Sequence, residues 1–141
     1  MALGRRKVDR QADFWVPTPD LPQSPGHPFY EQLNQVLAGA GFDRFCEESC
    51  RAFYHATLGR PSVPPGVYFR MLLVGYFEKL PSERQIAWRC ADSLSLRAFL
   101  GLAPGAGSPD DSSLNRSRLR MDLETHQAVF DWVLKRLAEH E

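Results

Sequence analysis

The sequence has no long apolar run, few cysteines and no excess of either charge. A membrane-spanning helix needs about 20 consecutive apolar residues. The most apolar segment, residues 67–77, is much shorter and is interrupted by Arg70 and Gly75. The first ten residues include four basic ones, but no apolar segment of a secretory signal follows them. We therefore expect a soluble, cytoplasmic protein with no membrane partner.

The three cysteines do not form a recognisable metal-binding pattern. Cys46 and Cys50 lie four residues apart on a predicted helix, and His55 follows about one turn later. A zinc site needs four ligands at recognisable spacing, and these residues do not supply them. A free cysteine in a reducing compartment behaves as a small buried hydrophobic residue, and we favour this interpretation for all three, Cys90 included. We expect no metal ion and no cofactor.

Motifs that carry catalysis are also missing. The GAG segment at residues 105–107 lacks the strand and the lysine of a phosphate-binding loop, and no nucleophile elbow is found. Two-metal phosphoryl transfer needs carboxylates from several elements that converge on ions ~4 Å apart. Asp110 and Asp111 are instead adjacent at a predicted helix start, where they favour the helix dipole. We expect no catalytic residue in this chain and no enzymatic activity from the chain alone.

The apolar residues recur with helical spacing, and no convincing strand pattern is found. Residues 1–26 carry four prolines among polar residues, which predicts a flexible N-terminal arm. Helices are predicted from Phe29 to Gly39, from Phe42 to before Gly59, from Pro64 to Phe77, and after Met121 to Glu141. The third of these is apolar on nearly all sides, as is typical of the central helix of a bundle. The sequence predicts an all-α fold, with one compact multi-helix bundle over residues 27–141.

Residues 82–121 are predicted to form a helix-turn-helix-like unit of three helices. Ser82 opens an S-x-x-Q capping box, which starts the first helix. Asp92 or Ser93 can cap the second helix, and Gly101 can end it. The turn between these two helices is very short, which favours the steep crossing of helix-turn-helix units.

The third helix of this unit carries three arginines. Ser108 or Asp110 can cap it. Helical spacing puts an apolar stripe on one face (Leu114, Ser117 and Met121) and a polar arc on the other (Asn115, Arg116, Leu119 and Arg120). Arginine suits phosphate and guanine, asparagine suits adenine, and a helix fits the major groove. The alternative is that these arginines only solvate a surface helix. The predicted DNA-binding residues are Asn115, Arg116, Arg118 and Arg120, with Arg84, Arg89 and Arg97 as rival contacts.

Charge is segregated along the chain although the formal net charge is zero. Residues 60–120 hold nine basic and five acidic residues, a net charge of +4. The flanking residues 27–59 and 121–141 have net charges of −2 and −3. This distribution predicts a specific but modest DNA contact that is helped by other domains or subunits.

The order of several segments resembles a known family. These segments are HPFYEQLNQVLAGAGFDRFCE, GRPSVPPGVYFRMLLVGYFE, SERQIAWRCADSLSLRAFLGL and PDDSSLNRSRLRM. Over residues 27–141 the chain is similar to the N-terminal helical domain of bacterial insertion-sequence transposases of the IS-five type, which carry a DDE catalytic core. The resemblance implies a role in transposition and DNA recombination. It also implies that the catalytic core begins beyond this sequence.

The resemblance implies a DNA partner, the double-stranded terminal inverted repeats of the element. It also implies a protein partner, either the catalytic domain or a second copy of the chain. A protein that binds such repeats would be associated with the nucleoid. One alternative is a protein-interaction or dimerisation module without direct DNA contact, in which the arginine helix is merely exposed. A stand-alone transcription regulator is another.

Overall fold

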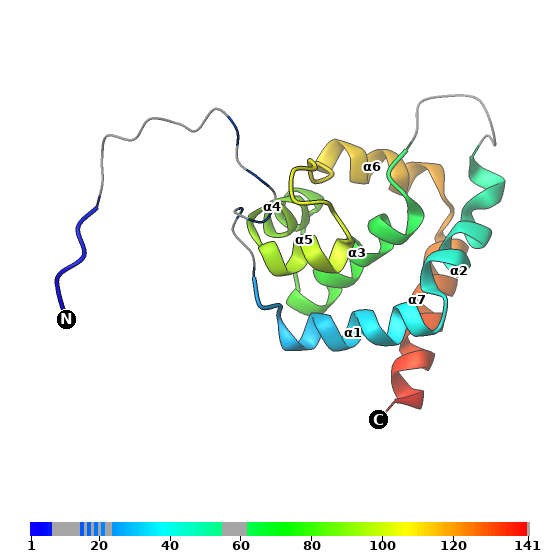
Figure 1. Cartoon of the computed structure of the whole chain (residues 1–141). Helices are drawn as coiled ribbons and strands as arrows, with labels where there is room; N and C mark the ends of the chain where they lie inside the picture. Colours follow the sequence, from blue (N-terminus) through cyan, green and yellow to red (C-terminus); the bar gives the residue numbers. More distant parts are fainter. Residues whose placement is uncertain are drawn as a thin grey trace.

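The computed structural model describes residues 1–6, 15, 17, 19, 21, 24–54 and 62–140. The described segments form helices and contain no β-strand (Figure 1), which confirms the predicted all-α class. The helices are α1 (Pro28–Gly39), α2 (Phe42–Cys50), the 3-10 helix η2 (Arg51–Phe53), α3 (Pro65–Glu78), α4 (Glu83–Asp92), α5 (Leu94–Leu100), α6 (Asp111–Arg120) and α7 (Leu123–Glu139). Much of the predicted N-terminal arm, His55 and the predicted helix end before Gly59 lie outside the described residues.

Side-chain caps begin three consecutive helices. The hydroxyl groups of Ser82 and Ser93 accept hydrogen bonds from backbone N–H groups at the starts of α4 and α5, each at 3.2 Å. The Asp110 carboxylate accepts the Ser113 N–H at 2.8 Å and starts α6. Of the alternatives left open by the sequence, Ser93 and Asp110 are therefore the caps. Ser108 is not, and its Oγ is buried without a hydrogen-bond partner among the described residues.

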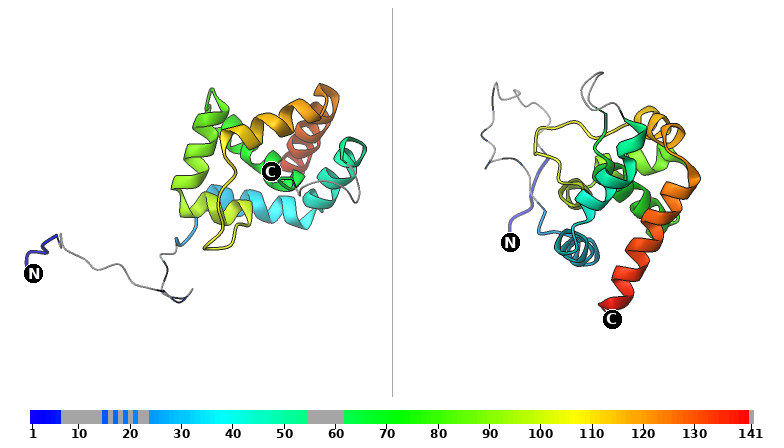
Figure 2. Two further views of the ribbon diagram at one scale, coloured as in Figure 1. Left: turned by 90° about the horizontal axis from the view of Figure 1, so that it is seen from above. Right: turned by 90° about the vertical axis from the view of Figure 1, so that its right-hand side faces the viewer.

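Helix α3 lies at the centre of the bundle, as its apolar sequence predicts. It packs against α2, α4 and α5, and α1 and α7 complete the surrounding layer (Figures 1 and 2). The α3 residues buried in the core include Tyr68, Phe69, Met71, Leu73 and Val74. Apolar burial of about 25 cal/mol per Å² is the main term that stabilises such a packed core.

A charged side chain is also buried in this central helix. Arg70 is 5% exposed, and its guanidinium makes a two-point contact with the Asp43 carboxylate of α2, at 2.7 and 3.1 Å. It also donates to the Asn34 side chain at 3.1 Å and to the Gly66 carbonyl at 3.3 Å. A buried charge is tolerated when it is paired and hydrogen-bonded in this way. Arg70 therefore joins α1, α2 and α3 and contributes no charge to the surface.

Helix α7 closes the bundle through aromatic contacts. The Trp132 ring stacks on Phe45 of α2, with ring centroids 4.8 Å apart. Nearer its start, His126 Nε2 lies 2.7 Å from the Tyr68 hydroxyl of α3. The C-terminal turns of α7 extend past the other helices (Figures 1 and 2). Among the described residues, no helix has the length and apolar character needed to cross a membrane.

Helices α4 and α5 are joined through the single residue Ser93, so the predicted tight turn is present. Helix α6 packs against α4. Asp111, at the start of α6, contacts Arg84, and Arg118, near its end, contacts Glu83, so both lie against the first two residues of α4. Helix α6 therefore crosses the start of α4. The assignment of this unit as helix-turn-helix-like remains a prediction.

Candidate nucleic-acid interface

The two faces of α6 lie as helical spacing predicts. Leu114, Ser117 and Met121 are buried against the bundle, whereas Leu119 is 73% exposed. Asn115 is half-buried, and Arg116 and Arg120 are exposed. The described part of the chain therefore presents a helix with a polar arc turned away from the core.

Arg116 and Arg120 have no acidic partner among the described residues. The Arg116 guanidinium donates a hydrogen bond to Ser113 Oγ at 3.2 Å on the same helix. The Arg120 guanidinium lies over the Tyr54 ring, 4.9 Å from its centroid. A cation above an aromatic ring keeps its charge and gains orientation. Both arginines are therefore available to an anionic partner.

Arg118 is held differently, although it lies on the same helix. Its Nε is 2.5 Å from Glu83 Oε1 of α4, and its Nη2 donates to Asn115 Oδ1 at 2.8 Å. Arg84 makes a longer contact in the same region, 3.8 Å from Asp111 Oδ2. These contacts partly neutralise Arg84 and Arg118, and they occupy the amide oxygen of Asn115. Arg118 thus connects α6 to α4.

The remaining two sequence-predicted contacts are engaged elsewhere. Arg89 Nε lies 2.7 Å from Glu78 Oε1 of α3, and the Tyr30 hydroxyl donates to the other oxygen of Glu78 at 2.5 Å. Arg97 donates to the backbone carbonyls of Ala103 and Ala106, in the loop before α6. The structure therefore brings Asn115, Arg116, Arg118 and Arg120 together on α6 and gives Arg89 and Arg97 separate contacts.

The Glu78 carboxylate has an altered proton affinity in this cluster. Its partial burial opposes ionisation, but hydrogen bonds from Tyr30 and Arg89 outweigh that effect and lower its pKa. The hydrogen bond to Glu78 raises the pKa of Arg89 in turn. Glu78 and Arg89 therefore form a stable ion pair that neutralises this arginine.

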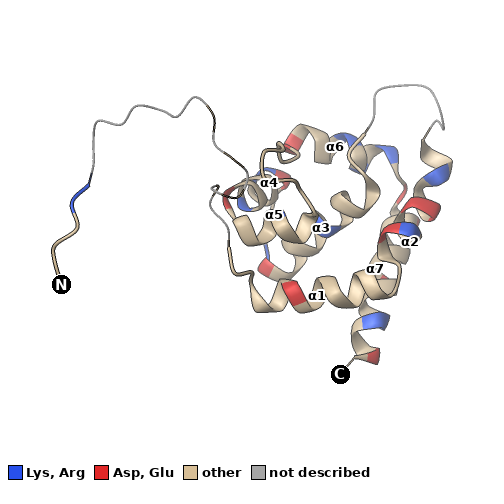
Figure 3. Cartoon of the chain, in the orientation of Figure 1, with Lys and Arg blue, Asp and Glu red and all other residues tan. Residues whose placement is uncertain are grey.

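The structure adds Arg51 to the surface near α6. The thiol of Cys50 contacts the Met121 sulfur at 3.0 Å, and Tyr54 contacts Arg120. These contacts hold η2 beside the end of α6, and Figure 3 shows basic residues on both elements. Arg51 is exposed within η2. Sequence reasoning missed it because only the tertiary fold places η2 beside α6.

The three cysteines are buried free thiols. Burial raises the pKa of all three thiols, to about 11 for Cys50 and about 12 for Cys90. They are therefore protonated at neutral pH, and a protonated thiol is a poor nucleophile and metal ligand. Among the described residues, no group of three or more His, Cys, Asp or Glu side chains is placed to hold a metal ion.

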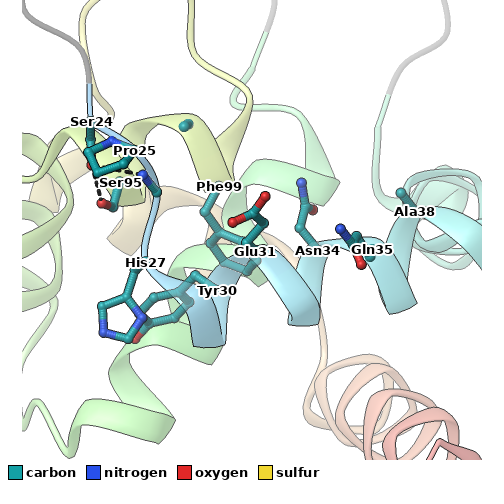
Figure 4. A pocket seen from close by; sticks show the side chains of 12 residues that line it. Ser24, Pro25, His27, Tyr30, Glu31, Asn34, Gln35, Ala38, Ser95 and Phe99 are labelled. Atoms are coloured by element: carbon teal, nitrogen blue, oxygen red, sulfur yellow. Dashed lines mark hydrogen bonds between the residues drawn. The ribbon is translucent and has the colours of Figure 1, made fainter.

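A cavity of about 390 Å³ lies between α1 and α5 (Figure 4). Its lining includes Tyr30, Glu31 and Asn34 of α1 and Phe99 of α5. The Ser24 hydroxyl lies 2.8 Å from Ser95 Oγ at one edge of the cavity. The segment before α1 therefore contacts the outer side of α5. None of the predicted DNA-binding residues lines this cavity.

Comparison with known proteins points to one family. The family model described as "Transposase domain (DUF772)" matches residues 19–120, from the segment before α1 to the last residue of α6. No match was found among curated proteins or among solved structures. The match covers well over half of the chain and includes the whole arginine-bearing helix. The chain therefore belongs to the transposase domain family (DUF772).

Proposed function

We propose that this chain is a DNA-binding accessory domain of an IS-five-type transposase and engages the terminal inverted repeats of its element through α6. The single observation that carries the proposal is the outward arc of α6, where Arg116 and Arg120 are exposed and unpaired with acids among the described residues. Membership of a transposase domain family supports the choice of DNA as the partner.

Helix α6 is better suited to enter the major groove than α5. In α5, Arg97 is occupied by loop carbonyls and Ser95 is hydrogen-bonded to Ser24. The exposed residues of α5 include Leu94 and Ala98, which carry no groups that recognise phosphates or base edges. In α6, forked guanidinium groups lie on a helix whose opposite face is fixed to the bundle, and this arrangement suits phosphate and guanine contacts.

Strand cleavage and joining, in this proposal, are carried out by a catalytic domain that acts together with this one. The chain contributes recognition of the element's ends and a rigid platform for assembly. Its acidic flanks, residues 27–59 and 121–141, limit non-specific attraction to DNA. The affinity of the isolated chain for DNA is therefore modest. The assembled complex binds DNA more tightly because it makes several such contacts at once.

The proposal is tested by equilibrium binding to a duplex that carries the DNA bordering the gene, with both element ends represented. Substituting Arg116 and Arg120 with Ala together is expected to weaken binding, because two phosphate contacts are lost. The matched control is Arg44→Ala with Lys135→Ala, which removes the same charge from α2 and α7. Equal weakening by both pairs would contradict a specific role for α6, as would binding that neither pair alters.

A protein-interaction role is the second candidate, and exposed aromatic residues favour it. Trp88 of α4 is 67% exposed. Tyr76 of α3, also exposed, contacts Phe130 of α7 with ring centroids 5.9 Å apart. Exposed tryptophan and tyrosine are enriched at binding hot spots. Loss of self-association in Trp88→Ala, with DNA binding unchanged in the Arg116 and Arg120 double variant, would favour this role over DNA binding.

A further inference from the structure

The most outward position of α6 is occupied by a leucine. At about 100° per residue, Leu119 lies about 140° around the helix from Leu114 and about 160° from Ser117, the two buried residues of α6. Its side chain is accordingly 73% exposed. Leu119 therefore stands at the centre of the face that α6 turns to any partner.

The neighbours of Leu119 on this face are polar or charged. Arg116 lies one turn before it and is exposed, and Asn115 lies on its other side. Ser112, also exposed, lies two turns before it on nearly the same line of the helix. The face thus consists of one apolar side chain surrounded by groups that donate hydrogen bonds.

This arrangement is suited to the major groove. Each base edge there presents hydrogen-bonding groups, and the C5-methyl of thymine is the apolar group that the groove offers. We propose that Leu119 packs against a thymine C5-methyl and makes the chain prefer thymine at one position of its site. This inference rests on the proposed DNA binding by α6, and it assigns a specificity-determining residue within it.

A protein pocket is the other partner that an exposed leucine could enter. The flanking arginines argue against it, because the centres of protein interfaces are depleted of charged residues. Burying Arg116 or Arg120 without acidic partners would carry a large desolvation cost. A DNA groove instead supplies phosphates to both arginines while Leu119 contacts the bases. The observations therefore favour DNA.

The inference is tested with two duplexes that differ only in the thymine methyl group. Both carry the DNA bordering the gene, one with thymine and the other with deoxyuridine at every thymine. The wild-type chain is expected to bind the deoxyuridine duplex roughly threefold to fivefold more weakly, the effect of one buried methyl group. Leu119→Ala is expected to bind both duplexes equally, because the leucine and the methyl group act as a pair.

The matched control is Leu123→Ala at the start of α7. Leu123 is 80% exposed but lies outside α6, so this variant should keep the wild-type preference for thymine. Circular dichroism of both variants checks that the helices remain. Equal wild-type binding to the two duplexes would overturn the role of Leu119 and leave the proposed function standing. If the wild-type chain bound neither duplex, both the role of Leu119 and the proposed function would be overturned. If Leu119→Ala changed only self-association, the partner of Leu119 would be a protein.

Discussion

Arg118 Nε of α6 lies 2.5 Å from Glu83 Oε1 of α4, at the point where the two helices cross. Glu83 is the first residue of α4, directly after its Ser82 cap. Only Leu114 and Ser117 of α6 are buried, so the hydrophobic attachment of this helix is small. Together with the packing of α6 on α4 and the contact of Asp111 with Arg84, the ion pair fixes the orientation of the arginine arc.

The pair is expected to make a measurable but small contribution to stability. The Arg118 side chain is 57% exposed and that of Glu83 is 24% exposed, so water screens the attraction. A double-mutant cycle of Glu83→Gln and Arg118→Gln in urea unfolding should give a coupling free energy of roughly 0.5–1 kcal/mol. Additive effects of the two substitutions would contradict a direct interaction.

Arg70 and Asp43 should respond unequally to substitution, because the arginine is buried and the aspartate is largely exposed. Asp43→Ala leaves a buried cation with only Asn34 and a carbonyl as partners, and we expect it to lower the free energy of unfolding by about 3 kcal/mol. Arg70→Met removes the buried charge and leaves Asp43 to water, with an expected loss of about 1 kcal/mol. Urea unfolding of both variants gives the comparison.

The order of these two losses is the decisive result. A larger loss for Arg70→Met than for Asp43→Ala would show that the ion pair itself, and not the desolvation of Arg70, dominates. Gly66→Ala provides an independent check. A Cβ at Gly66 would overlap the Asp43 carboxylate, so this variant should also weaken the Arg70 contact and lower the stability.

Glu78 should make stability depend on pH in the acid range. Its pKa is lower in the folded chain than in the unfolded chain, so its contribution is complete above about pH 5 and is lost as the pH falls below about 4. Glu78→Gln is expected to lower the free energy of unfolding by about 1–2 kcal/mol at neutral pH. The difference from wild type should shrink as the pH falls below the ordinary glutamate pKa of about 4.3 and disappear once Glu78 is protonated in the folded chain. A difference that stays constant from neutral pH down to the acid unfolding transition would rule out the ionised carboxylate as its source.

The parts of the fold that local sequence determines could be predicted. A helix cap involves residues three apart, so Ser82 marks the start of α4 in the sequence, and Ser93 and Asp110 are among the candidate caps for α5 and α6. The choices between Asp92 and Ser93, and between Ser108 and Asp110, could not be made, because both members of each pair are residue types that cap helices. The inward and outward faces of α6 follow from helical spacing alone.

The parts that depend on contacts between distant residues could not be predicted. Arg70 contributed to the basic charge of residues 60–120 in the sequence, yet Asn34 and Asp43 from two other helices hold it inside the bundle. Arg89 also counted as a basic residue in the sequence, but its charge is neutralised by Glu78, which lies on another helix, α3. A sequence shows how many arginines a segment has, but tertiary packing decides which of them remain available to DNA.

The salt dependence of DNA binding tests the central claim most directly. Each phosphate contact contributes about 0.9 to the slope of log K against log salt concentration. Substituting Arg116 and Arg120 with Ala should therefore reduce the wild-type slope by about two, whereas the Arg44 and Lys135 control should leave it unchanged. An unchanged slope in the Arg116 and Arg120 variant would contradict the claim that α6 grips the DNA backbone.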